Sequence, residues 1–177
     1  AEAQGGEYTL RATTADGQYY FSTAHTFIRG GGTYANRPST AATLGMSSLE
    51  SGLINFKRMK DPMGNPMPLT VQSLFIPPEL EPVAYELNSI RRPDTANWAE
   101  NWLSGKVSVE TSPFITSTTQ WMLLGPAKDR KVFWVWNVRP MTSHGFDFDK
   151  HAAKTKTLFS ASQVAVDPRG AYGSPGA

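Results

Sequence analysis

The sequence predicts a mixed α+β fold. Two stretches, at residues 47–60 and 77–90, carry apolar residues at the three- and four-residue spacing of amphipathic helices. Two others, at residues 121–124 and 131–138, are short continuous apolar runs of the kind found in buried strands. The 15 glycines and 13 prolines are spread along the 177 residues and predict many short elements joined by long connections.

Composition bounds the class of protein. A chain of 177 residues is one domain, or one and a half at most. The absence of cysteine excludes a disulfide scaffold and a thiolate metal site. A net charge of +2 is too small to predict a dedicated nucleic-acid binder, and no apolar run approaches the roughly 18 residues of a membrane helix. The chain starts with alanine and without a signal peptide, so we expect that a segment has been removed upstream.

The N-terminal part predicts little regular structure. Short strands are expected at residues 8–13 and 19–21, and residues 22–43 are expected to form a long irregular loop. The glycine run at residues 30–32 lacks the pattern of a phosphate-binding loop. His25 lies three residues after Ser22, but no nucleophile elbow is present, so a hydrolytic triad is not predicted.

The two predicted helices have clear ends and faces. Ser47 and Glu50 fit a capping box at the start of the first, and Pro77 opens the second. The expected core faces are Met46, Leu49, Leu53 and Phe56 in the first helix and Leu80, Val83, Ala84 and Leu87 in the second.

The second half predicts strands at residues 106–110, 121–124, 131–138 and 154–166, after an earlier one at 69–76. The runs at 121–124 and 131–138 are expected in the middle of a sheet that helices cover on each face. Trp121, Trp134 and Trp136 are accordingly assigned to the core.

One cluster has metal-ligating side chains, namely His144, Asp147, Asp149 and His151. In a strand, alternation would put Asp147, Asp149 and His151 on one face. The favoured interpretation is a polar strand edge, with Phe146 and Phe148 buried behind it. A metal-dependent hydrolase that uses the four residues remains an alternative from another class.

Two features predict an interface. Trp98 and Trp102 lie four residues apart in a polar stretch, close to the basic pair Arg91 and Arg92. The alternative is that both tryptophans pack on the flank of their own domain. With no catalytic constellation elsewhere, the residues predict a structural or binding domain rather than an enzyme.

An ordered series of motifs carries a family resemblance. It includes Ser-Thr-Ala-His at 22–25, Ser-Ser-Leu-Glu at 47–50, Phe-Ile-Pro-Pro-Glu-Leu at 75–80, Ser-Pro-Phe at 112–114, Trp-Met-Leu-Leu at 121–124, Gly-Phe-Asp-Phe-Asp at 145–149 and Asp-Pro-Arg-Gly-Ala-Tyr at 167–172. From residue 16 to residue 172, the chain resembles the C-terminal part of a tailed-bacteriophage major capsid protein of the Mu-like prophage major head subunit family.

The resemblance implies a Hong Kong 97-type fold, in which an axial domain has a central sheet flanked by two helices. It implies peripheral-domain strands and a long loop at residues 1–42, the axial domain at 43–145, and a peripheral strand with a C-terminal return at 146–177. The family's N-terminal arm, extended hairpin loop and spine helix have no counterpart here, so the chain alone is expected to lack contacts that lock neighbouring subunits.

The implied function is structural. Copies of the subunit would form the hexamers and pentamers of an icosahedral shell around double-stranded DNA, with scaffold and portal proteins as further partners and no membrane. The resemblance implies no catalytic residue, cofactor or metal. The shell would be part of a virion and would be assembled in the cytoplasm of a bacterial host. The closest alternative is an encapsulin-like shell protein of a bacterial compartment.

Overall fold

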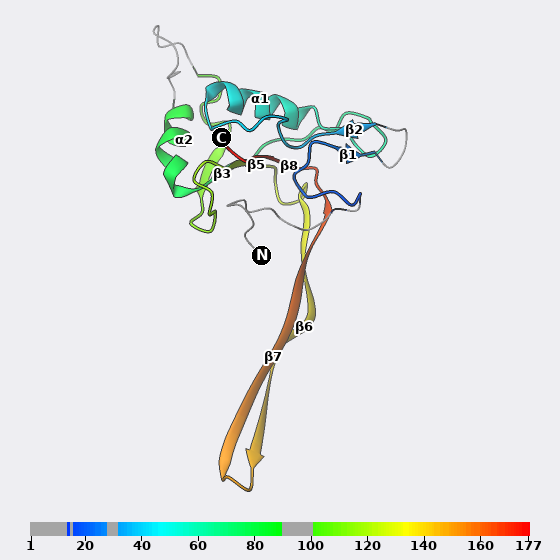
Figure 1. Cartoon of the computed structure of the whole chain (residues 1–177), viewed down its shortest axis with the longest axis vertical. Coiled ribbons are helices and arrows are strands. Elements are labelled where there is room, and N and C mark those ends of the chain that lie inside the picture. The colour runs from blue at the N-terminus through cyan, green and yellow to red at the C-terminus, as the bar shows by residue number, and fades with distance from the viewer. Residues whose placement is uncertain (1–13, 15, 28–31, 90–100) are drawn as a thin grey trace.

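A computed structural model describes residues 14, 16–27, 32–89 and 101–177. The predicted mixed α+β class is confirmed, with a sheet, few helices and two hairpins (Figure 1). The elements are β1 (His25–Thr26), β2 (Thr33–Tyr34), α1 (Met46–Lys57), β3 (Ser73–Ile76), a 3-10 turn (Pro78–Leu80), α2 (Glu81–Leu87), β4 (Ser108–Thr111), β5 (Trp121–Leu124), β6 (Lys131–Asp147), β7 (Ala152–Asp167) and β8 (Ala171–Ser174).

Four short strands form the sheet, in the order β4-β3-β5-β8. β3 runs parallel to β4 and antiparallel to β5, which in turn pairs antiparallel with β8. Trp121, Met122 and Leu123 of β5 are buried, as expected for an interior strand.

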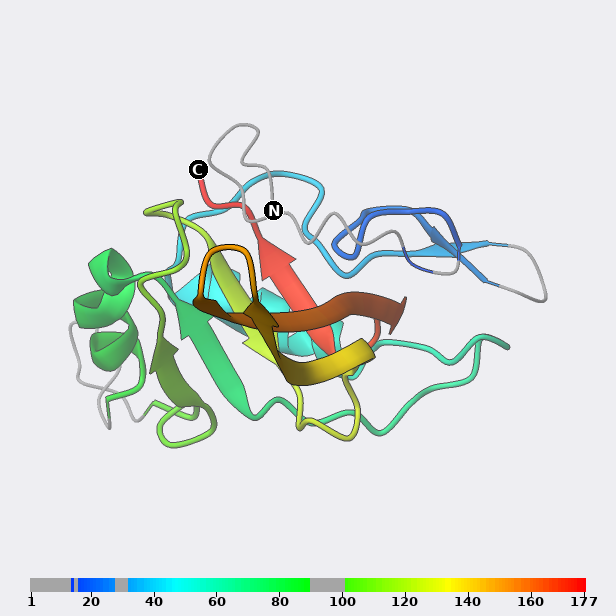
Figure 2. The same cartoon turned by 90° about the horizontal axis from the view of Figure 1, so that it is seen from below.

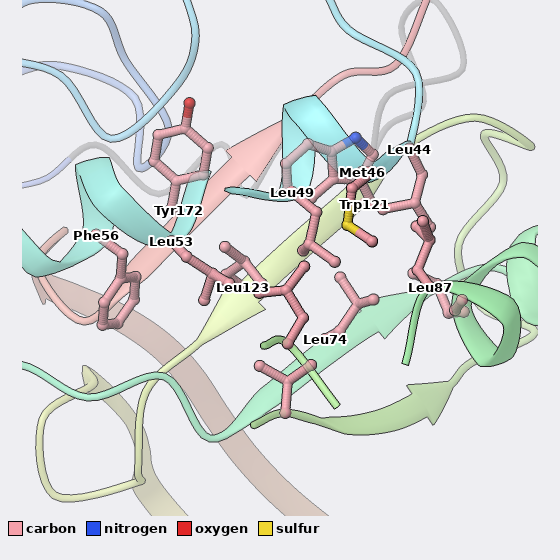
Figure 3. Packing of buried hydrophobic residues seen from close by; sticks show 14 of the residues in the cluster. Leu44, Met46, Leu49, Leu53, Phe56, Leu74, Leu87, Trp121, Leu123 and Tyr172 are labelled. Atoms are coloured by element: carbon pink, nitrogen blue, oxygen red, sulfur yellow. The ribbon is translucent and has the colours of Figure 1, made fainter. Parts of the chain in front are cut away.

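The main core lies between α1 and one face of this sheet (Figure 3). Leu49, Leu53 and Phe56 from the helix join Leu74 and Leu123 from the strands in one buried cluster. Residues three and four apart share a helix face, so the expected apolar stripe of α1 is the one that is buried. Gly52 allows close approach, because a Cβ there would lie 3.1 Å from side-chain atoms of Trp121 and Leu123.

Helix α1 begins differently from the expectation. Its N-cap is Gly45, whose N–H donates to Ser48 Oγ at 2.9 Å, so the capping box predicted at Ser47 and Glu50 is wrong. Ala84 and Leu87 of α2 belong to the same cluster as α1, so the described helices do not cover both sheet faces as predicted.

The opposite face of the sheet carries a smaller cluster and the start of a long hairpin. Tyr20, Ala165 and Ala171 are buried there, and the Phe21 ring lies over Gly173. Seen along the hairpin, the sheet lies between α1 and the β6–β7 pair (Figure 2).

The β6–β7 hairpin projects far from the sheet (Figure 1). The chain exposes 11181 Å², whereas a compact protein of its mass would expose about 8,500 Å². The expectation that residues 131–138 form a buried central strand is therefore wrong, because they begin this exposed hairpin.

The predicted three-part division remains a prediction. Its boundary between residues 145 and 146 falls inside β6, and β8 pairs with β5 of the sheet. In the N-terminal part, residues 22–43 contain the short β1–β2 hairpin, while the strand predicted at 8–13 lies outside the described residues.

Adjacent residues of α1 allow a matched test of the core. Leu53→Ala should lower the free energy of unfolding by about 2–5 kcal/mol, because Leu53 is only 4% exposed and its truncation leaves a cavity. Ile54→Ala is the control; Ile54 is 47% exposed, and the expected change is within about 1 kcal/mol. Urea denaturation monitored by tryptophan fluorescence measures both, and equal losses would contradict the packing of α1.

Candidate interaction surface

The candidate site is the surface of the β6–β7 hairpin and the region around its root. The strands pair from Lys131↔Asp167 to Asp147↔Ala152. At about 3.3 Å per residue, the hairpin is about 50 Å long. β6 is irregular between Trp136 and Met141, where six residues of β6 (136–141) lie alongside only four residues of β7 (158–161).

One face of the hairpin is aromatic. Trp134 lies opposite Gln163, Trp136 opposite Ala161 and Phe146 opposite Ala153. Because alternate residues of a strand share a face, Phe159 of β7 belongs with them. We call Trp134, Trp136, Phe146 and Phe159 the aromatic face; all four side chains are exposed.

The other face is also apolar near the root. Its exposed members are Phe133, Val135, Met141, Leu158 and Val164. Toward the tip it becomes polar, with Lys154 and Lys156 opposite Gly145 and Ser143. Among the described residues, no second layer covers either face along the projecting part of the hairpin (Figure 1).

The tip combines an aromatic pair with charges. Phe146 and Phe148 form an edge-to-face contact with ring centroids 5.2 Å apart, and Phe148 is 80% exposed. Lys154 Nζ donates to Asp147 Oδ2 at 2.5 Å, and this hydrogen bond lowers the pKa of Asp147. His151 closes the turn with φ 47, a left-handed conformation in which non-glycine residues are uncommon.

A buried polar network holds the hairpin root. His25 is fully buried, with Nδ1 2.8 Å from Asp16 Oδ2 and Nε2 3.2 Å from Asn36 Oδ1. Asn36 Nδ2 donates to the carbonyl oxygens of Tyr20 at 2.7 Å and Pro168 at 3.2 Å. Pro168 directly follows β7, so this network ties the β1–β2 hairpin to the returning strand.

Arg169 makes the second connection at the root. Its guanidinium donates to Asp167 Oδ1 at 2.9 Å and to the Lys60 carbonyl oxygen at 2.7 Å, and it lies 4.7 Å from the Tyr34 ring centroid. The next residue, Gly170, has φ +84, and a Cβ there would approach the Asp129 carbonyl oxygen to 2.7 Å. The turn from β7 into β8 therefore requires glycine.

Two side chains at the root, Asp16 and Tyr20, have shifted pKa values. Burial acts to raise the pKa of Asp16, but hydrogen bonds from Thr14, His25 and the Gln18 backbone outweigh it and lower that pKa to about 2. Burial also raises the pKa of Tyr20 to about 12, so its hydroxyl stays protonated at neutral pH.

An apolar groove of about 720 Å³ lies beside the hairpin root. Its floor is the open face of the sheet, and its lining includes Phe75, Met122, Leu124, Phe114, Val132 and Arg130. Arg130 Nε is buried and has no hydrogen-bond partner among the described residues. The groove thus offers apolar surface and one unsatisfied cationic donor.

Of the four predicted interface residues, the structure describes only Trp102. Arg91, Arg92 and Trp98 lie outside the described residues. Trp102 is 46% exposed, and its Nε1 donates to Glu50 Oε1 of α1 at 2.9 Å. Trp102 therefore lies against α1, away from the β6–β7 hairpin.

The four candidate metal ligands are not brought together. His144 Nδ1 contacts Thr155 Oγ1 at 3.1 Å, and Asp147 pairs with Lys154. Asp149 and His151 belong to the turn, so the expectation that they share a strand face with Asp147 is wrong. In the described ranges, no group of three or more His, Asp or Glu side chains could hold a metal ion.

The assignment of four aromatic residues to the interior is wrong. Trp134, Trp136, Phe146 and Phe148 are all exposed on the hairpin. The sequence does contain a signal for the hairpin, because two strand-like stretches of similar length, at residues 131–147 and 152–167, flank a short turn at residues 148–151. The apolar run at residues 131–138 predicts an interior strand instead, because strands that are apolar on both faces are normally buried.

Comparisons with protein-family models, curated proteins and solved structures found no match to this chain. Within the described residues, no helix is long and apolar enough to cross a membrane.

The low pKa of Asp16 predicts a pH-dependent contribution to stability. A carboxyl whose pKa falls from 3.8 to about 2 on folding stabilises the protein above pH 4, and this contribution of about 2 kcal/mol is lost as the pH falls toward 2. The difference in unfolding free energy between wild type and Asp16→Asn should therefore shrink over that range.

Urea denaturation at a series of pH values measures this difference. Glu86→Gln, on the exposed side of α2, is the control and should differ from wild type by no more than about 0.5 kcal/mol at each pH. An Asp16→Asn difference that stays constant down to pH 2 would contradict the role of the network.

Proposed function

We propose that this chain is a structural subunit that associates with copies of itself to build the icosahedral head of a tailed phage or prophage. In this proposal it has the Hong Kong 97-type fold, with peripheral-domain strands and a long loop at residues 1–42, the axial domain at 43–145, and a peripheral strand with a C-terminal return at 146–177. The shell encloses double-stranded DNA and belongs to a virion that is assembled in the bacterial cytoplasm.

The observation that carries the proposal is the uncovered apolar hairpin. Eleven large apolar side chains of residues 131–167 are exposed, six of them aromatic: Phe133, Trp134, Val135, Trp136, Met141, Phe146, Phe148, Leu158, Phe159, Val164 and Val166. Together they expose on the order of 1,000 Å², which exceeds the roughly 800 Å² that each partner buries in a standard interface.

The hairpin should be more stable when other protein surface covers its two faces. A two-stranded hairpin is marginally stable in water unless a further strand or a second layer packs against it. Large apolar patches on a protein surface mark interaction sites. Contacts with neighbouring copies would supply the missing layer on both faces, which is the arrangement that a wall of repeated subunits needs.

The ordered motifs from residue 16 to residue 172 direct the proposal to a phage head. The charge balance fits the same role, because a net charge of +2 allows close packing of copies without strong repulsion. DNA would be held without sequence specificity, and scaffold and portal proteins would be the other partners.

Removing the aromatic face should prevent association. Trp134→Ser with Trp136→Ser is expected to abolish concentration-dependent oligomers, because these rings are two of the largest exposed apolar groups. Tyr85→Ser is the control, since Tyr85 is 60% exposed on α2, away from the hairpin. Sedimentation velocity over a concentration series, with electron microscopy of the largest species, makes the measurement.

Circular dichroism confirms that each variant is folded before the comparison. A wild-type chain that stays monomeric at every concentration would reject the proposal. Particles that contain DNA would support a phage head, whereas particles that contain an enzyme cargo would identify a compartment shell instead.

A further inference from the structure

We propose that the groove at the hairpin root receives the hairpin tip of a second copy of this chain. The inference rests on the proposed self-association and adds to it a defined contact: the aromatic pair Phe146 and Phe148 enters the groove, and Asp149 pairs with Arg130.

The groove is a site that the described residues of the chain leave open. Phe75, Met122 and Leu124 lie on the sheet face opposite α1, and Phe114 at the groove is 74% exposed. A volume of about 720 Å³ falls within the range of sites that enclose drug-sized groups, so two phenyl rings fit.

The tip that fills the groove must come from another molecule. Val132 of β6 and Gln163 of β7 line the groove at the root, while Phe148 lies at the far end of the same hairpin. The strands stay paired along their length, so about 50 Å separates a groove from its own tip. Figure 1 shows this separation between the sheet and the turn.

The chemistry of the tip matches that of the groove. Phe148 is the most exposed large apolar side chain among the described residues, and it contacts Phe146. Asp149 directly follows it, and its carboxylate has no ion pair among the described residues, whereas Asp147 is paired with Lys154. A carboxylate beside the inserted rings would satisfy the buried Nε of Arg130.

This contact joins two different surfaces, so it is head-to-tail. Each copy has one tip and one groove, and each can therefore engage two neighbours. Such a contact generates a ring where the rotation between copies closes, which is how a hexamer or pentamer would form.

Crosslinking tests the contact directly, since the chain has no cysteine of its own. Lys150→Cys marks the turn without removing either phenyl ring, and Ala127→Cys marks the groove. A mixture of the two single variants, treated with a short bismaleimide, should give a covalent dimer whose linked peptides contain residues 150 and 127. Met63→Cys, exposed in another loop, replaces Ala127→Cys as the control.

A crosslinking yield no higher than that of the Met63→Cys control would overturn the proposal. So would a Lys150→Cys/Ala127→Cys double variant that crosslinks within one chain under conditions where the protein is monomeric.

Charge reversal provides an independent test. Asp149→Arg, on the exposed turn, and Arg130→Glu should each raise the concentration for half-maximal association about tenfold or more, and the double variant should recover most of that loss. Arg130→Gln provides a milder change should Arg130→Glu fail to fold.

The two proposals can fail separately. If the Trp134/Trp136 variant blocks association but the substitutions at Asp149 and Arg130 do not, self-association stands and this contact is rejected. If the wild-type chain does not associate, both proposals fail.

Discussion

The organisation of this protein depends on the fact that a two-stranded hairpin has two faces and no layer of its own to cover them. In the β4-β3-β5-β8 sheet, α1 covers one face and gives the domain its core. In β6–β7 the same kinds of side chain, Trp, Phe, Val and Leu, remain in contact with water. Their exposure is unfavourable by roughly 25 cal/mol for each Å² of apolar surface, and this free energy would drive the proposed association.

The hairpin can present its side chains in a defined direction only if contacts at its root hold it in place relative to the sheet. The root network adds polar contacts to the small apolar cluster around Tyr20, Ala165 and Ala171. Asn36 bonds to Tyr20 and Pro168, and Arg169 bonds to Asp167 and Lys60, so segments distant in sequence meet at the base of the hairpin. Buried hydrogen bonds have specific geometry, and they orient the hairpin more sharply than a small apolar cluster would.

The apolar pattern of the sequence predicted elements correctly where the apolar side chains are buried within the chain itself. Leu49, Leu53 and Phe56 lie at helical spacing and form the core face of α1, and Trp121 to Leu124 form a buried strand as predicted. The same rule failed for Trp134 and Trp136, because an apolar run indicates burial without stating whether its own chain or another molecule provides it. The Asp16–His25–Asn36 network could not be predicted, since its members come from separate loops whose meeting depends on the tertiary fold.

The irregular part of β6 between Trp136 and Met141 has a consequence for stoichiometry. Bulges bend a hairpin and increase its right-handed twist, so the direction in which Trp134 and Trp136 point differs from that of Phe146. One flat partner cannot cover both ends of a twisted strip. In the proposed assembly, covering both ends of the hairpin would therefore take at least two neighbouring copies.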